Sequence, residues 1–76
     1  MKAELLDRIT LNPEIFGGKP IIRGVRIKVS NIIEFLAAGM TNEEILADYP
    51  YLALQDMQAA LLFTSMKLNH PVLHAA

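Results

Sequence analysis

With 76 residues and no cysteine, the chain is long enough for one small domain that disulfide bonds cannot stabilise, and its longest apolar run, five residues, excludes a membrane-spanning helix. Hydrophobic residues make up 53% of it, more than so small a monomer readily hides, which favours a homodimer. The first residues lack the apolar core of a signal peptide, so a cytoplasmic protein without a membrane partner is expected. The net charge of −1 argues against a strongly nucleic-acid-binding chain, although residues 15–28 carry four basic residues and no acid, while residues 29–66 carry five acids and no base.

The N-terminal part of the chain predicts a small β element over residues 8–29. A short polar lead over residues 1–7 is expected to precede a brief strand over residues 8–11. Asn12 and Pro13 then favour a turn, because asparagine bonds its own backbone and proline fixes φ.

Residues 17–29 predict a β-hairpin that carries most of the positive charge. Gly24 and Val25 fit the centre of a two-residue type II′ turn, because glycine accepts positive φ at the first central position, and this turn pairs Ile22 with Ile27. The outer face presents Arg23, Arg26 and Lys28. Together with Lys19, which precedes the strands, these basic side chains are expected to bind an anionic partner. The alternative is a solvated strand face, charged to discourage aggregation.

Two short helices are expected after the hairpin. Ser30 is a good N-cap for the first, over residues 31–38, and a C′ glycine ends it. Thr41 and Glu44 have the spacing of a capping box at the start of the second, over residues 42–48.

A longer third helix is expected over residues 54–68, with a poorly capped start at Ala53 and with Asp56 placed to interact with the helix dipole. Two apolar stripes run along it, so it is expected to pack against two separate neighbours. The first stripe is assigned to the core of the chain: Met57, Ala60, Leu61, Thr64 and Leu68. The second stripe is assigned to a homodimer interface: Leu62, Phe63 and Met66. Residues 69–76 are expected to form a tail.

The expected fold is therefore mainly α, with a three-helix core over residues 30–68 and a small N-terminal β-hairpin. Two short helices joined by a glycine turn and followed by a longer helix are the plan of a helix-turn-helix module. The third helix of such a module would present Gln55, Gln58 and Ala59 to base edges. Because that helix has no basic residue before Lys67, phosphate attraction would have to come from the hairpin.

Residues 17–27 read Gly-Gly-Lys-Pro-x-Ile-Arg-Gly-x-Arg-Ile, a distinctive string. Further matching segments are Asn12-Pro13-Glu14-Ile15, Gly39-x-Thr41-x-Glu43-Glu44-Ile45 and Tyr49-Pro50. Together they resemble a family of short prokaryotic proteins of unknown function that is grouped with VapB-type antitoxins. The resemblance extends over residues 8–66. It implies a homeodomain-like helix-turn-helix core, a homodimer, and an antitoxin of a type II toxin–antitoxin pair that neutralises a PIN-like ribonuclease toxin.

Protein binding is the favoured function. An arginine that reaches into a cluster of metal-binding carboxylates forms charge-assisted, often bidentate bonds, and Arg23 and Arg26 are the candidates. The alternative is a helix-turn-helix transcriptional autoregulator that binds DNA. In a third arrangement, the basic hairpin of one copy would lie on the acidic helical half of another. Its basic side chains would then be paired and unavailable for binding a protein or DNA.

No catalytic site, cofactor, metal or small-molecule substrate is expected. Gly17 and Lys19 belong to a string like a phosphate loop, but that motif ends in Ser or Thr and opens a helix, whereas Pro20 follows here. His70 and His74 lie near the end of the chain with no third metal ligand close by in sequence.

Overall fold

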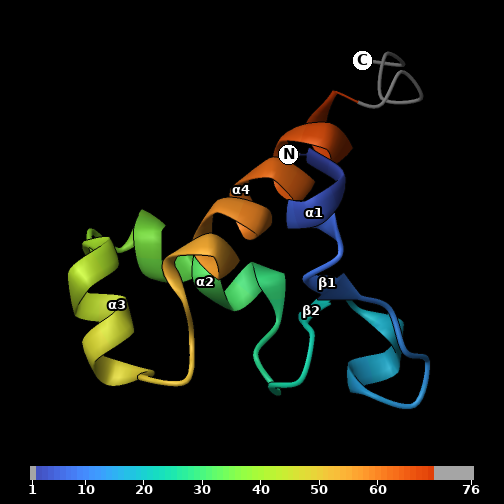
Figure 1. The fold of residues 1–76 in the computed structure, drawn as a ribbon, viewed down its shortest axis with the longest axis horizontal. Helices are drawn as coiled ribbons and strands as arrows, with labels where there is room; N and C mark the ends of the chain where they lie inside the picture. Colours follow the sequence, from blue (N-terminus) through green and yellow to red (C-terminus); the bar gives the residue numbers. More distant parts are fainter. Residues whose placement is uncertain (1, 70–76) are drawn as a thin grey trace.

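The computed structural model describes residues 2–69, and most of the expected tail, with both of its histidines, lies outside that range. The described part contains α1 (Lys2–Leu6), β1 (Ile9–Thr10), η1 (Phe16–Gly18), β2 (Ile21–Ile22), α2 (Val29–Ala37), α3 (Asn42–Asp48) and α4 (Leu54–Leu68) (Figure 1). The expected class, mainly α with a small antiparallel β element, is confirmed. None of the helices within residues 2–69 is long and apolar enough to cross a membrane.

The long helix α4 is the central element of the fold, and α1, β1, α2 and α3 all contact it (Figure 1). Buried apolar side chains from β2, the following loop, all three core helices and the connection before α4 form one cluster: Ile22, Ile27, Val29, Ile32, Ile45, Leu52, Met57 and Ala60. The three helices expected over residues 30–68 are thus present as α2, α3 and α4.

The two-stranded sheet pairs β1 with β2, rather than the two arms of the expected hairpin. Ile9 lies opposite Ile22 in antiparallel register. The expected register of Ile22 with Ile27 does occur, since the Ile22 N–H donates to the Ile27 carbonyl at 3.0 Å. Beyond that pair there is only an isolated bridge between Ile21 and Lys28, because α2 begins at the next residue and leaves no room for a second arm.

The turn after β2 uses Gly24 in a different position from the expected one. The Val25 N–H donates to the Ile22 carbonyl at 3.2 Å, so the turn spans residues 22–25 and Gly24 is its third residue, with φ 81°. A positive φ in the third position is what a type II turn requires. Gly24 is therefore needed for its positive φ. The predicted type II′ turn, with Gly24 in the second position, was wrong, because the observed turn begins one residue earlier.

Replacing Gly24 with alanine is expected to destabilise the fold by about 1–2 kcal/mol through backbone strain. A Cβ at this position would meet no atom within 4 Å, so steric overlap adds nothing. Gly24→Asn is expected to lose less, because asparagine tolerates the left-handed conformation. Urea denaturation measures the change, with exposed Arg23→Ala as a control expected within about 0.5 kcal/mol of wild type. Equal midpoints for Gly24→Ala and wild type would show that the turn does not depend on positive φ.

The first core helix begins earlier than expected. Ser30 was predicted to cap a helix over residues 31–38, but α2 begins at Val29 and Lys28 is the N-cap residue. The Asn31 Oδ1 accepts a hydrogen bond from the Lys28 N–H at 3.1 Å. This side-chain acceptor in the first turn satisfies the backbone donor of Lys28, which fixes the start of the helix there.

The second core helix has the predicted bounds because its capping box forms. The Thr41 Oγ1 accepts from the Glu44 N–H at 3.1 Å, and the Glu44 Oε1 accepts from the Thr41 N–H at 2.8 Å. Just before it, Gly39 ends α2 with φ 95°, and the Met40 N–H donates to the Phe35 carbonyl at 3.1 Å. This is the glycine-ended Schellman geometry that the sequence pattern predicts.

The N-terminal residues, expected as a polar lead, instead form the helix α1, which packs on α4. Leu5 and Leu6 are half-buried. A helix of five residues has little stability of its own and depends on the packing that partly buries these leucines. Five residues are also too few to show a clear helical pattern in the sequence.

The two stripes predicted along α4 are only partly correct. Met57 and Ala60 are buried, but Leu61 and Leu68, also assigned to the core, are 50% and 71% exposed. Phe63, assigned to a dimer interface, packs instead against the chain's own core. The unpredicted helix α1 accounts for part of the difference, because it packs on α4 and its Leu6 lies beside Phe63.

Candidate functional site

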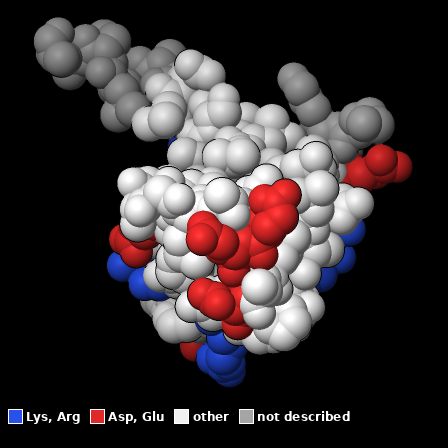
Figure 2. Space-filling model, turned by 90° about the vertical axis from the view of Figure 1, so that its left-hand side faces the viewer, with Lys and Arg blue, Asp and Glu red and all other residues white. Residues whose placement is uncertain are grey.

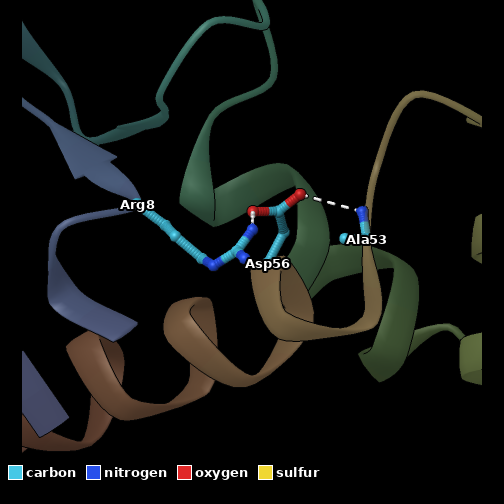
Figure 3. A network of polar contacts seen from close by, with 3 residues as sticks. All are labelled: Arg8, Ala53 and Asp56. Carbon is cyan, nitrogen blue, oxygen red and sulfur yellow. Dashed lines mark hydrogen bonds and ion pairs between the residues drawn. The ribbon is translucent and has the colours of Figure 1, made fainter. Parts of the chain in front are cut away.

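An ion pair between the residue before β1 and the first turn of α4 anchors one surface of the molecule. Arg8 Nη1 donates to Asp56 Oδ1 at 2.9 Å, and Asp56 Oδ2 accepts from the Ala53 N–H at 2.9 Å (Figure 3). Asp56 is buried, whereas the Arg8 side chain is 40% exposed. One carboxylate thus compensates for the poor cap at Ala53 and holds the Arg8 guanidinium at the surface.

Arg23 lies beside Arg8 because the sheet places it there. The Arg23 N–H donates to the Arg8 carbonyl at 2.7 Å, which extends the pairing of β1 with β2 by one residue. Both arginines line a hollow of about 500 Å³, here called the arginine hollow. The other charged and aromatic side chains that line it are Glu4, Asp7, Tyr51 and Asp56.

The predicted glutamines adjoin the arginine hollow. Gln55 and Gln58 are exposed on α4 and line a neighbouring hollow of about 340 Å³, which shares Glu4 and Arg8 with the first. Arg23, predicted from the hairpin, and the two glutamines, predicted from the third helix, are therefore brought onto one surface with Arg8 between them. We call this the arginine–glutamine surface, made of Arg8, Arg23, Tyr51, Gln55 and Gln58.

The other predicted basic residues do not line the arginine hollow. Arg26 is exposed but is not among the residues that line the arginine hollow. Lys28 is half-buried, with its Nζ 5.5 Å from the centroid of the Phe16 ring. Lys19 lines a separate groove of about 440 Å³ together with Lys67. The short strand pairing is the physical reason, because only a continuous hairpin would align these side chains.

The charges around the arginine–glutamine surface are mixed. Two guanidinium groups, of Arg8 and Arg23, face three carboxylates, of Glu4, Asp7 and Asp56. Further acids gather on the face that α3 presents, where Figure 2 shows a cluster of Asp and Glu side chains. A polyanion gains little attraction from such a surface, whereas a protein with charges of both signs can match it.

One position predicted to contact bases is unavailable. Ala59 is fully buried against the rest of the chain, so it cannot meet a base edge, although Gln55 and Gln58 on the same helix are exposed.

Sequence reasoning missed Arg8 as a site residue and missed the ion pair of Asp56. The two residues are 48 positions apart, and no local pattern connects them. A weaker signal was present, since an acid three residues after the poor cap Ala53 has the spacing of half a capping box.

Residues 9–64 match the model of a family described as "Protein of unknown function (DUF433)". The match includes Arg23, Tyr51 and both glutamines, while Arg8 lies one residue outside it. A protein of Sinorhizobium fredii, described as "Uncharacterized protein y4eO", is 33% identical over 55 residues, which cover 72% of this chain and 25% of that protein. The chain therefore spans about a quarter of the length of this curated relative.

The crystal structure of a DUF433 member protein from Anabaena variabilis is similar in fold, with a TM-score of 0.76. The two chains are 31% identical, and the comparison covers 84% of this chain and 63% of that one. The similarity of fold and of sequence thus extends over most of the elements that carry the arginine–glutamine surface.

Proposed function

Since the chain belongs to the DUF433 family of proteins of unknown function, we propose from its surfaces that it acts by binding a protein partner with charges of both signs at the arginine–glutamine surface. The specific form of this role is that of a cytoplasmic antitoxin that neutralises a PIN-like ribonuclease. The observation that carries it is the pairing of an anchored arginine, Arg8, with an exposed one, Arg23, on the rim of one hollow.

The two arginines are suited to carboxylates in different ways. Arg8 is held in position by Asp56 through one nitrogen, so its remaining N–H groups are pre-organised for a second acceptor. For Arg23, no ion pair is recorded with any residue in the described range 2–69. A guanidinium can grip a carboxylate through two parallel hydrogen bonds, which is the contact that covering a cluster of metal-binding carboxylates requires.

The remaining members of the surface also favour a protein partner. Tyr51 is 59% exposed, and tyrosine and arginine are the residue types that dominate protein–protein contacts. The Asp7 carboxylate at the hollow would repel a nucleic acid backbone but can pair with a basic side chain of a protein. DNA binding by α4 is therefore the less favoured function.

Replacing Arg23 with alanine is expected to weaken binding to the protein encoded by the adjacent gene, the proposed nuclease partner, by about 10–100-fold, equivalent to about 1.4–2.8 kcal/mol. Calorimetric titration of the purified proteins measures the change. Arg26→Ala is the matched control, because it removes the same charge from an exposed position outside the hollow. Equal losses for the two variants would mean that overall charge, not the hollow, determines binding.

Two further results separate the partners. If co-expression with the adjacent gene yields no complex, the antitoxin role is wrong. If the chain instead retains its own upstream DNA in a mobility-shift assay, with affinity that falls as salt is raised, nucleic acid is the ligand of this surface.

A further inference from the structure

We propose that the groove between α2, α4 and the loop before β2 binds, without converting it, a small amphiphilic ligand: an aliphatic chain that ends in one carboxylate. This groove, here called the lysine groove, has a volume of about 440 Å³ and is lined by Lys19 and Lys67 beside a mostly apolar wall. It shares no lining residue with the arginine hollow, so the site does not depend on the proposed function.

The wall of the lysine groove suits an aliphatic chain. Its apolar members are Pro20, Val29, Ile33 and Phe63, and all but the buried Val29 are still partly reached by water, which a bound chain would displace. A concave, mainly apolar surface of this size with a few polar groups is typical of small-ligand sites. The Lys67 ammonium covers one face of the Phe63 ring, so an aliphatic chain fits this wall better than an aromatic ring that would stack there.

The two lysines of the groove suit an anionic group at one end of that chain. Both side chains are exposed, and within residues 2–69 neither forms an ion pair with a carboxylate. Lys67 Nζ lies 5.3 Å from the centroid of the Phe63 ring, a cation–π contact that holds the ammonium beside the apolar wall. Lys19 comes from the loop before β2, so ammonium groups from two separate elements line one groove. An ammonium only donates hydrogen bonds, so the complementary group is an anion.

Glu34 restricts the charge of that anion. It is the one acidic residue in the lining, and with the two lysines it gives the groove a net charge of +1. A carboxylate carries a single negative charge and matches this value. A phosphate group carries about −1.5 to −2 and would meet more repulsion from Glu34.

The start of the distinctive Gly-Gly-Lys-Pro string forms one side of the lysine groove. The Pro20 carbonyl accepts from the Val29 N–H at 2.9 Å, which fixes the residues before β2 against the first residue of α2. The Lys19 N–H donates to the Phe16 carbonyl at 3.3 Å. These two backbone bonds hold Lys19 next to the wall that α2 and α4 provide.

An NMR titration of the isotope-labelled full chain with sodium octanoate, kept below its micelle concentration, tests the site. Saturable shifts are expected in the amide signals around Lys19, Ile33 and Thr64, which line the groove. Octylamine, with the same chain and the opposite charge, is expected to bind at least about 5-fold more weakly. Butanoate is expected to bind about 10–200-fold more weakly, because it buries fewer methylene groups. No saturable shift with octanoate, or equal affinity for octanoate and octylamine, overturns the proposal.

Three charge variants test the roles of the lining residues. Lys19→Glu is expected to weaken octanoate binding about 5–25-fold, because it removes an attraction and adds a repulsion of similar size. Glu34→Gln is expected to tighten binding about 2–5-fold, a gain that a loss of folding cannot produce. Arg26→Glu is the matched control, with the same change of net charge at an exposed residue outside the groove, and is expected to bind like wild type. Equal losses for Lys19→Glu and Arg26→Glu, or weaker binding by Glu34→Gln, contradict the site.

Vesicles distinguish a free ligand from a lipid surface, which also offers anionic groups and aliphatic chains. Vesicles of phosphatidylcholine and phosphatidylglycerol are floated on a density gradient in the presence of the chain, and the chain is expected to remain in the dense fraction. Co-flotation with the vesicles, together with no response to free octanoate, would mean that a membrane surface occupies the groove and that the proposal is wrong.

Discussion

Replacing Asp56 with alanine is expected to destabilise the fold by about 2–3 kcal/mol, because hydrogen bonds to a charged group are lost and the partly buried N–H of Ala53 at the start of α4 loses its acceptor. Solvent reaches the Arg8 side chain, which is 40% exposed, and this offsets part of the cost of unpairing it. For a domain of this size the change corresponds to a fall in Tm of about 8–24 °C, measured by calorimetry or thermal circular dichroism.

Two variants separate the contributions of this carboxylate. Asp56→Asn retains an oxygen that can accept from the Ala53 N–H and removes only the charge, so it is expected to lose about half as much as alanine. Asp48→Ala removes an exposed acid from α3 and is expected to remain within about 0.5 kcal/mol of wild type. A small effect of Asp56→Ala, equal to that of Asp48→Ala, would mean that the ion pair does not stabilise the fold.

Replacing Ile32 with alanine is expected to cost about 2–5 kcal/mol, through the lost transfer free energy and the cavity left behind. Ile32 is 0% exposed in α2 and belongs to the single core cluster. A 76-residue domain has only about 4–11 kcal/mol of stability in total, so this variant is expected to be substantially unfolded at physiological temperature. Urea denaturation at low temperature measures the loss.

Leu61→Ala is the matched control for the core variant, because it truncates an aliphatic side chain that is half exposed. At concentrations where the chain is monomeric, it is expected to lose less than about 1 kcal/mol, since surface substitutions cost little. Similar losses of unfolding free energy for Ile32→Ala and Leu61→Ala would contradict the assignment of Ile32 to the core.

The elements that sequence alone predicted well are those with local causes. The bounds of α3 were predicted because Thr41 and Glu44 cap each other, and the bounds of α4 because Pro50 and the apolar pattern delimit it. The register of Ile22 with Ile27 was predicted because only a few residues separate the two. In each case the physical interaction lies within a short stretch of chain.

The features that were missed depend on contacts between distant residues. The ion pair of Arg8 with Asp56 connects residues that are 48 positions apart, and α1 is stabilised by packing on α4. Leu61, assigned to the core from its place in the stripe, is 50% exposed. Periodicity shows that a helix has an apolar stripe, but it does not show which neighbour covers it.

The arginine–glutamine surface was half predicted for the same reason. Arg23, Gln55 and Gln58 were identified by residue type and by their expected elements. Their convergence, and the arginine that joins them, follow from β1 pairing with β2 and from the carboxylate at the start of α4. Stability and binding therefore share one residue, Asp56, which holds Arg8 in place.

An NMR titration of the isotope-labelled chain with the protein encoded by the adjacent gene tests most directly the claim that this chain binds a protein through the arginine–glutamine surface. We predict that the amide signals that shift most belong to residues around Arg23, Tyr51 and Gln55. Shifts confined to the acidic face of α3, with those three regions unchanged, would contradict the claim.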